Sequence, residues 1–143
     1  MNTKQVIVFR KDLLKGDRSI RKGKFAAQCC HASVGSLLEL FNKSWITHDG
    51  LDDKTRRYEV SFGEDCVLYD WLEGSFAKVV VSVDSEDELL KIEKICMAKD
   101  IPCKLIVDEG RTEFNGTPTV TCLGIGPYIS EEIDKITGNL PLL

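Results

Sequence analysis

Three polar side chains suited to binding an anionic or carbonyl-bearing ligand recur at helical spacing within residues 23–32. Lys24, Gln28 and His31 lie four and then three residues apart, so on a helix they fall within roughly 60° of one another. Gly35 continues this stripe. The other side of the same helix carries apolar residues, namely Ala26, Cys29, Cys30, Leu37, Leu40 and Phe41. Because a helix packs on a core through its apolar side, we expect that side to be buried and the polar stripe to face a ligand.

A second group of polar side chains, Asp108, Arg111 and Thr112, directly follows the apolar run 103–107. In α/β sheets, ligands gather at the loops beyond the strand ends. If the strands predicted over 5–9 and 103–107 are parallel, the loops that follow them emerge at one sheet edge. This group would then lie near Lys24.

A carboxylate and an ammonium group in one cleft suit hydrolysis. A carboxylate can orient or deprotonate a water molecule, and a lysine can stabilise the oxyanion that forms when the water attacks a carbonyl. The lysine also favours the ionised carboxylate. The alternative is a purely structural Lys24–Asp108 salt bridge with Thr112 closing a turn, and physical arguments alone do not choose between the two. On its own, His31 is typical of a hydrogen-bonded group, and Arg111 of a residue that braces a loop or contacts phosphate.

The segment 10–24 is strongly basic, with seven lysines and arginines against two aspartates, although the whole chain has a net charge of −4. Basic patches bind phosphates by releasing counterions, so Arg18, Arg21 and Lys22 are candidate nucleic-acid contacts. A solvated basic loop is the alternative interpretation.

The apolar pattern predicts an α/β fold in a single domain, residues 1–143. Strands alternating with helices favour a mixed four-stranded sheet sandwiched between helices. Residues 44–75 are predicted to be an insertion after the first helix that packs on the body through its aromatic residues. The expected strands are 5–9, 77–83, 103–107 and 119–125, and the expected helices run from 23 to about 42, from 85 to 99 and from 130 to 138.

Several classes of protein are disfavoured by the composition. No apolar run approaches the ~20 residues that span a bilayer, and the N-terminus lacks a signal-peptide pattern, so we expect a cytoplasmic protein with no membrane partner. The six cysteines include no Cys-x-x-Cys pair and there are only two histidines, which argues for reduced thiols and against a structural metal site.

Four sequence blocks resemble the archaeal and eukaryotic-type peptidyl-tRNA hydrolases, the second and structurally separate family with that activity. They are Arg-Lys-Asp-Leu at 10–13, Gly-Lys-Phe-Ala-Ala-Gln-Cys-Cys-His-Ala at 23–32, Asp-Glu-Gly-Arg-Thr at 108–112 and Leu-Gly-Ile-Gly-Pro at 123–127. Residues 133–140 form a weaker fifth block.

This resemblance implies hydrolysis of the ester bond between peptide and tRNA in peptidyl-tRNA, which releases free tRNA and peptide, with no cofactor or metal. It implies catalytic roles for Lys24, Asp108 and Thr112, substrate contacts for Gln28 and His31, and a possible homodimer.

Three features depart from the family pattern. The basic loop between Leu13 and Gly23 looks longer than usual, residues 44–75 look extended, and Glu109 replaces a small residue. A second anion beside Asp108 is expected to raise its pKa. These departures motivate the alternative of a non-catalytic tRNA- or protein-binding module that retains the fold.

Overall fold

A four-stranded mixed sheet forms the centre of the molecule, in a computed structural model that describes residues 1–16, 19–50, 54–111 and 113–143. The strands are β1 (Thr3–Arg10), β4 (Lys78–Val83), β5 (Cys103–Asp108) and β6 (Thr119–Ile129), in the order β4-β1-β6-β5. β1 is parallel to β4, whereas β6 is antiparallel to both β1 and β5. β1 and β5 therefore run in the same direction, as the sequence predicted, and their carboxyl ends lie at one sheet edge.

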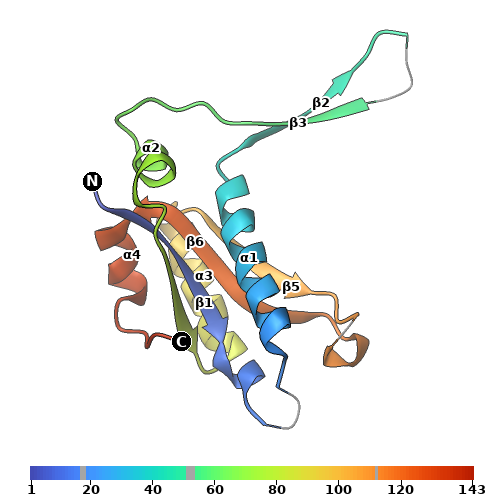
Figure 1. Ribbon diagram of the computed structural model, residues 1–143, viewed down its shortest axis with the longest axis vertical. Coiled ribbons are helices and arrows are strands. Elements are labelled where there is room, and N and C mark those ends of the chain that lie inside the picture. The colour runs from blue at the N-terminus through green and yellow to red at the C-terminus, as the bar shows by residue number, and fades with distance from the viewer. Residues whose placement is uncertain (17–18, 51–53, 112) are drawn as a thin grey trace.

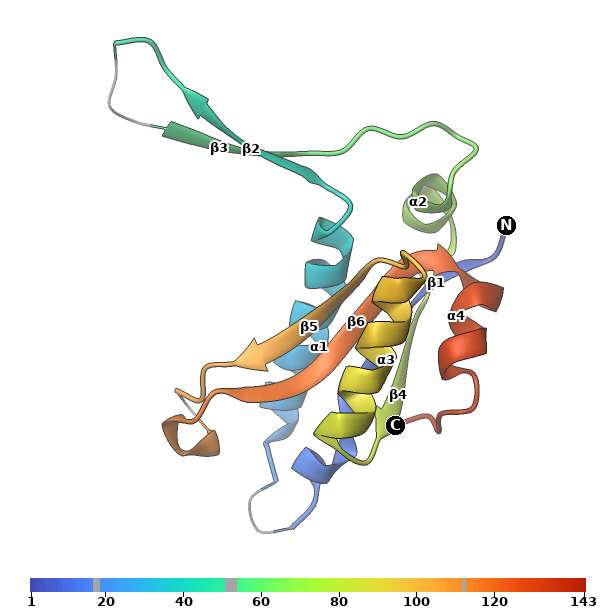
Figure 2. The same ribbon diagram turned by 180° about the vertical axis from the view of Figure 1, so that it is seen from behind.

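Side chains alternate between the two faces of the sheet and bury both of them. Val6 and Val8 of β1 lie in the core beneath α3 (Glu86–Ala98) and α4 (Ser130–Thr137). Ile7 and Phe9 belong to a second core, beneath α1 (Lys22–Leu38). Figures 1 and 2 show α1 on one face and α3 with α4 on the other. The predicted α/β sandwich in a single domain is confirmed.

The face that α1 presents to the sheet differs from the prediction. Gln28, Ala32 and Ser36 are buried, whereas Ala26 and Cys30 are exposed. The physical reason is that small side chains let the helix backbone approach the sheet closely. A Cβ atom on Gly124 of β6 would lie only 2.1 Å from the carbonyl oxygen of Ala32, and the Ser36 hydroxyl donates a hydrogen bond to the buried carbonyl of Gly126. The stripe that includes Lys24 and Gln28 thus faces the protein.

Two antiparallel strands, β2 (Asn42–Thr47) and β3 (Lys54–Glu59), pair as a hairpin that extends away from the body (Figure 1). α1 ends at Leu38, earlier than predicted, because the chain turns into β2. The hairpin is followed by a short helix α2 (Val67–Asp70) and a π-helical turn (Trp71–Ser75).

The expectation that the aromatic residues of 44–75 pack on the body holds only in part. Trp71 is buried and donates a 2.9 Å hydrogen bond to the carbonyl of Ala77, but Trp45 and Tyr58 of the hairpin are 62% and 49% exposed. That residues 44–75 are an insertion within the domain stays a prediction.

The remaining elements follow the predicted order with local differences. Two hydrogen bonds cap the start of α3. Glu88 N donates to Ser85 Oγ, and the N–H of Asp84, the residue before the N-cap, donates to the Glu88 carboxylate. Leu89, Ile92 and Cys96 form the buried face of α3, whereas Ile95 is 43% exposed. β6 continues past its predicted end at residue 125. Gly126, which has a positive φ, lies in a bulge of β6 where Gly126 and Pro127 oppose the single residue Gln5 of β1.

We predict that Gly124→Ala destabilises the protein by about 1–3 kcal/mol. The added methyl group meets backbone atoms of α1, which no rotamer change can relieve, so α1 must move away from the sheet. Urea unfolding measures the change. Gly63→Ala is the matched control, because a Cβ there meets nothing within 4 Å, and it should stay within about 0.5 kcal/mol of wild type. Equal stability of the two variants would contradict the close helix–sheet approach.

Candidate active site

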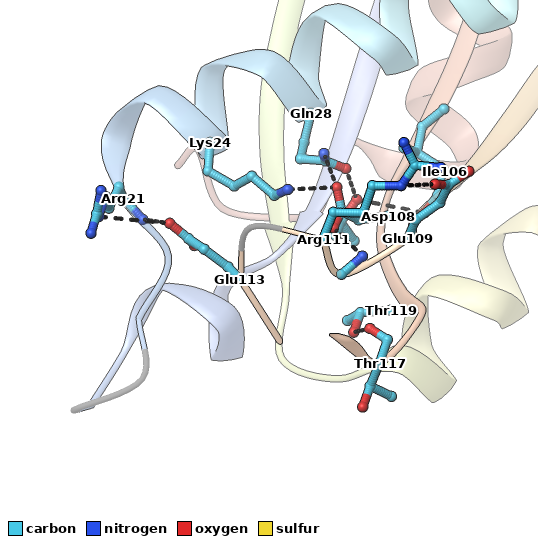
Figure 3. Close-up of polar contacts among 12 residues, drawn as sticks. Arg21, Lys24, Gln28, Ile106, Asp108, Glu109, Arg111, Glu113, Thr117 and Thr119 are labelled. Carbon is cyan, nitrogen blue, oxygen red and sulfur yellow. Dashed lines mark hydrogen bonds and ion pairs between the residues drawn. The ribbon is translucent and has the colours of Figure 1, made fainter. Parts of the chain in front are cut away.

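An ion pair joins the start of α1 to the end of β5 (Figure 3). Lys24 Nζ lies 2.7 Å from Asp108 Oδ2, and the two side chains are only 15% and 12% exposed. The parallel direction of β1 and β5 explains the meeting: the loop after β1 returns the chain as α1 at the sheet edge where β5 ends. The predicted proximity of Lys24 and Asp108 is confirmed.

A chain of hydrogen bonds behind the ion pair fixes the Asp108 carboxylate. Gln28 Nε2 donates to Asp108 Oδ2 at 3.0 Å. The hydroxyl of Thr121, a fully buried residue of β6, donates to Gln28 Oε1 at 2.6 Å. Because an amide has its acceptor and its donors on different atoms, the bond from Thr121 forces the Gln28 NH₂ group to point at Asp108.

The loop after β5 supplies a third donor to the carboxylate. The Gly110 backbone N–H donates to Asp108 Oδ1 at 2.8 Å. Gly110 has a φ of +78°, and a Cβ there would lie 2.5 Å from the carbonyl oxygen of Thr117. Glycine is therefore needed at this position both for its conformation and for the tight closure of the loop.

The pKa of Asp108 lies below its ordinary value. Burial alone raises this pKa, but the hydrogen bond and charge of Lys24 together with the donors Gly110 and Gln28 outweigh the burial. Asp108 is consequently an anion at neutral pH and Lys24 faces it as a cation.

Glu109 does not raise the pKa of Asp108, contrary to the prediction. Its carboxylate lies 2.7 Å from Arg111 Nε, and both side chains are largely exposed. The arginine compensates this charge and water screens it, so the environment of Asp108 is set by Lys24, Gln28 and Gly110.

Five of the predicted site residues line an open cavity of about 350 Å³ beside the ion pair. His31 is exposed, Arg111 is 83% exposed, and both border this cavity. Its other lining residues are Lys24, Gln28, Val107, Asp108 and Glu109.

That Gln28 contacts substrate stays a prediction. The residue is only 1% exposed, and its side chain is bonded to Asp108 and Thr121, so in this structure it positions the carboxylate. Thr112 and Arg18 lie outside the described residues.

A larger cavity of about 740 Å³ lies beside the basic loop. Lys15 and Arg21 border it on one side and Phe114 on the other. Phe114 lies close to the smaller cavity as well, because Lys24 Nζ, which lines that cavity, is 6.0 Å from the centroid of its ring.

Only some charges of the basic segment point outward. Arg10 pairs with Asp12 at 2.7 Å, and Lys11 pairs with Asp84 at 3.2 Å. Lys15, Arg21 and Lys22 are exposed, although Arg21 Nε lies 3.9 Å from the Glu113 carboxylate. Among the described residues of the basic segment, these three are the exposed cations.

Thr121 and Phe114 are the residues of the site that sequence reasoning missed. A signal for Thr121 exists, since it is a polar residue within the apolar run 120–125 and a buried hydroxyl needs a partner. Phe114 carries no comparable signal because it lies in a polar loop.

The described part of the chain contains no cluster of three or more histidine, cysteine, aspartate or glutamate side chains arranged to hold a metal ion. Within the same residues, no helix has the length and apolar character needed to cross a membrane.

Comparison with known proteins gives a consistent result. The family model described as Peptidyl-tRNA hydrolase PTH2 matches residues 3–143. A peptidyl-tRNA hydrolase of Methanothermobacter thermautotrophicus is 45% identical over 140 residues, which cover 98% of this chain and 99% of the relative. Similar proteins of the same name from Sulfurisphaera tokodaii and Methanopyrus kandleri are 40% and 36% identical. The first match covers all of both chains, and the second covers 98% of this chain and 97% of the relative.

We predict that Thr121→Val lowers the free energy of unfolding by about 1–3 kcal/mol, because it leaves the buried Gln28 Oε1 without its donor. Chemical denaturation measures the loss. The control is Thr137→Val, which removes another buried hydroxyl whose acceptor, the Ile133 carbonyl, lies within α4 and is accessible to helical N–H groups. The free energy of unfolding of Thr137→Val should therefore fall by less than that of Thr121→Val. If both variants lose the same amount, the Thr121–Gln28 bond has no special importance.

Proposed function

This chain belongs to the peptidyl-tRNA hydrolase PTH2 family, and from this premise we propose that the Lys24–Asp108 pair is the centre at which it hydrolyses peptidyl-tRNA. Water attacks the carbonyl carbon of the ester that joins the peptide to the terminal ribose. The bond between this carbon and the ribose oxygen breaks, the ribose oxygen takes up a proton that the water gives up and becomes a hydroxyl, and the peptide leaves with a free carboxyl group. One observation carries the assignment, namely an ionised pair held at 2.7 Å beside an open cavity.

Asp108 orients the attacking water in this proposal. A carboxylate has about four acceptor sites, and the described donors Lys24, Gln28 and Gly110 occupy three of them. A water can bond at the fourth, facing the cavity. Because the lowered pKa makes Asp108 a weak proton acceptor, its main contribution is to hold the water in position for attack.

Lys24 stabilises the negative charge that develops on the carbonyl oxygen. A cation already fixed at this point by its bond to Asp108 needs no reorganisation when the charge forms, and this preorganisation is what makes such groups effective. The family resemblance adds Thr112 as a residue that positions the water or Lys24.

The two cavities suggest how the substrate lies. We assign the tRNA end to the larger cavity, where Lys15 and Arg21 border it, with Arg18 and Lys22 as further phosphate contacts. The ester and the peptide then occupy the smaller cavity, near His31 and Arg111. The resemblance to the family supports two further proposals, a cytoplasmic location and a homodimer.

The alternative is a module that binds tRNA or protein without cleaving the ester. The exposed hairpin and Glu109 favour it, but the ionised Lys24–Asp108 pair does not, because binding alone has no need for a nearly buried charge pair. Hydrolysis of a different ester or amide by the same residues is a third option. Turnover of a panel of aminoacyl and peptidyl esters separates it from the first.

We predict that Asp108→Asn and Lys24→Met each reduce turnover of peptidyl-tRNA by about 10²-fold or more, the cost of losing one water-orienting or oxyanion-stabilising group. The assay is release of labelled N-acetyl-aminoacyl product from tRNA. Matched controls are Asp134→Asn and Lys4→Met, which break a comparable lysine–carboxylate pair of 2.5 Å elsewhere on the protein.

Both control variants should keep turnover within about twofold of wild type, because surface ion pairs contribute little to stability. Near-normal turnover by the two site variants would refute the assignment. Binding of tRNA by the wild-type protein without release of product would favour the non-catalytic alternative.

A further inference from the structure

One face of the β2–β3 hairpin concentrates aromatic and basic side chains. Directly opposed residues of paired strands share a face, so the pairs Lys43–Tyr58, Trp45–Arg56 and Thr47–Lys54 lie together. We call Lys43, Trp45, Lys54, Arg56 and Tyr58 the basic aromatic face. It contains three cations and no acidic residue, although the whole chain has a net charge of −4. The opposite face carries Asn42, Ser44, Ile46, Thr55, Arg57 and Glu59.

The rings of this face are open to solvent and are held by a cation. The Arg56 guanidinium lies 5.0 Å from the ring of Trp45 and 5.4 Å from that of Tyr58, while the two rings stay largely exposed. The hairpin projects from the body in both views (Figures 1 and 2). Trp45 is exposed and does not pack in the core, so stability of the fold does not explain why a tryptophan stands at this position.

The position of the hairpin restricts the kind of ligand. Lys24 lies in the first turn of α1. The helix ends at Leu38, and the hairpin begins after that residue. At 1.5 Å per residue these points are about 20 Å apart along the helix. A ligand that reaches both must extend far beyond its scissile ester, as a tRNA does.

We propose that the basic aromatic face binds the RNA of the substrate tRNA at a site remote from the ester. Lys43, Lys54 and Arg56 contact backbone phosphates, and an unpaired base stacks on Trp45 or Tyr58. Cations that track the backbone, combined with exposed rings that accept a base, are the usual means of binding RNA without reading a sequence. This proposal rests on the proposed function, because it requires tRNA to be the substrate.

A second copy of the chain fits this face less well. A two-fold symmetric contact places the same patch on both sides, so the three cations would meet three identical cations. Such juxtaposition of like charges is costly. The charge of the face therefore favours a polyanion.

The first test is binding of full-length deacylated tRNA. We expect Trp45→Ala to weaken binding about tenfold and Trp45→Phe to restore it to within about twofold, because phenylalanine keeps a stacking ring. Arg56→Gln should weaken binding and lower the slope of log K against log salt by about 0.7–0.9. Its matched control is Arg57→Gln, which removes the same charge from the opposite face and should change affinity by less than about twofold.

The second test compares two substrates. The kcat/KM of Trp45→Ala should fall about tenfold on full-length N-acetyl-aminoacyl-tRNA, in line with the loss of stacking, and stay at the wild-type value on the same ester of the 3′-terminal trinucleotide. The short substrate reaches the ion pair but not the hairpin.

Three results would overturn the proposal. They are unchanged tRNA binding by Trp45→Ala, equal losses for Arg56→Gln and Arg57→Gln, and a change of oligomeric state in Trp45→Ala measured by sedimentation without tRNA. Failure of the proposed function gives a different result, namely that Asp108→Asn retains turnover of peptidyl-tRNA. Binding of deacylated tRNA involves no turnover, so the two failures can be told apart.

Discussion

A nearly buried carboxylate imposes the main constraint on this structure. Removing a charge from water is costly unless donors replace the lost hydration, and Asp108 receives them from Lys24, Gln28 and Gly110. These donors belong to α1 and to the loop after β5, so the ion pair forms only if helix, strand end and loop converge at one sheet edge. The topology β4-β1-β6-β5, with β1 and β5 running in the same direction, provides that convergence.

The close approach of α1 to the sheet is what brings the donors of α1 within reach of Asp108. Ala32 and Ser36 on the helix and Gly124 on β6 leave almost no space between the two backbones. Gln28, one turn before Ala32, can therefore reach both Thr121 and Asp108. Packing and electrostatics thus depend on the same side of α1, which carries Lys24 at one end and leads into the hairpin at the other.

Residue patterns predicted the order of the elements, the parallel direction of the strands that carry the two motifs, and the meeting of Lys24 with Asp108. They failed on the buried face of α1, because hydropathy favours the side that carries Ala26 and Cys30, whereas the close approach to Gly124 places the side with Ala32 and Ser36 against the sheet. They also missed the strands β2 and β3. Each of these strands is mostly polar, contains one aromatic residue and has no buried face, so no hydrophobic period marks it. The expected effect of Glu109 was wrong because Arg111, two residues later, compensates its charge.

The central claim is that Lys24 keeps Asp108 ionised in a nearly buried site. The most direct test is a titration of the Asp108 side-chain carboxyl carbon by NMR in wild type and in Lys24→Met. We expect a midpoint below the ordinary value of 3.8 in the wild-type protein. In the variant the midpoint should rise, because burial still disfavours the anion while the charge and hydrogen bond of Lys24 are lost. Equal midpoints in the two proteins, or a wild-type midpoint above the ordinary value, would contradict the account.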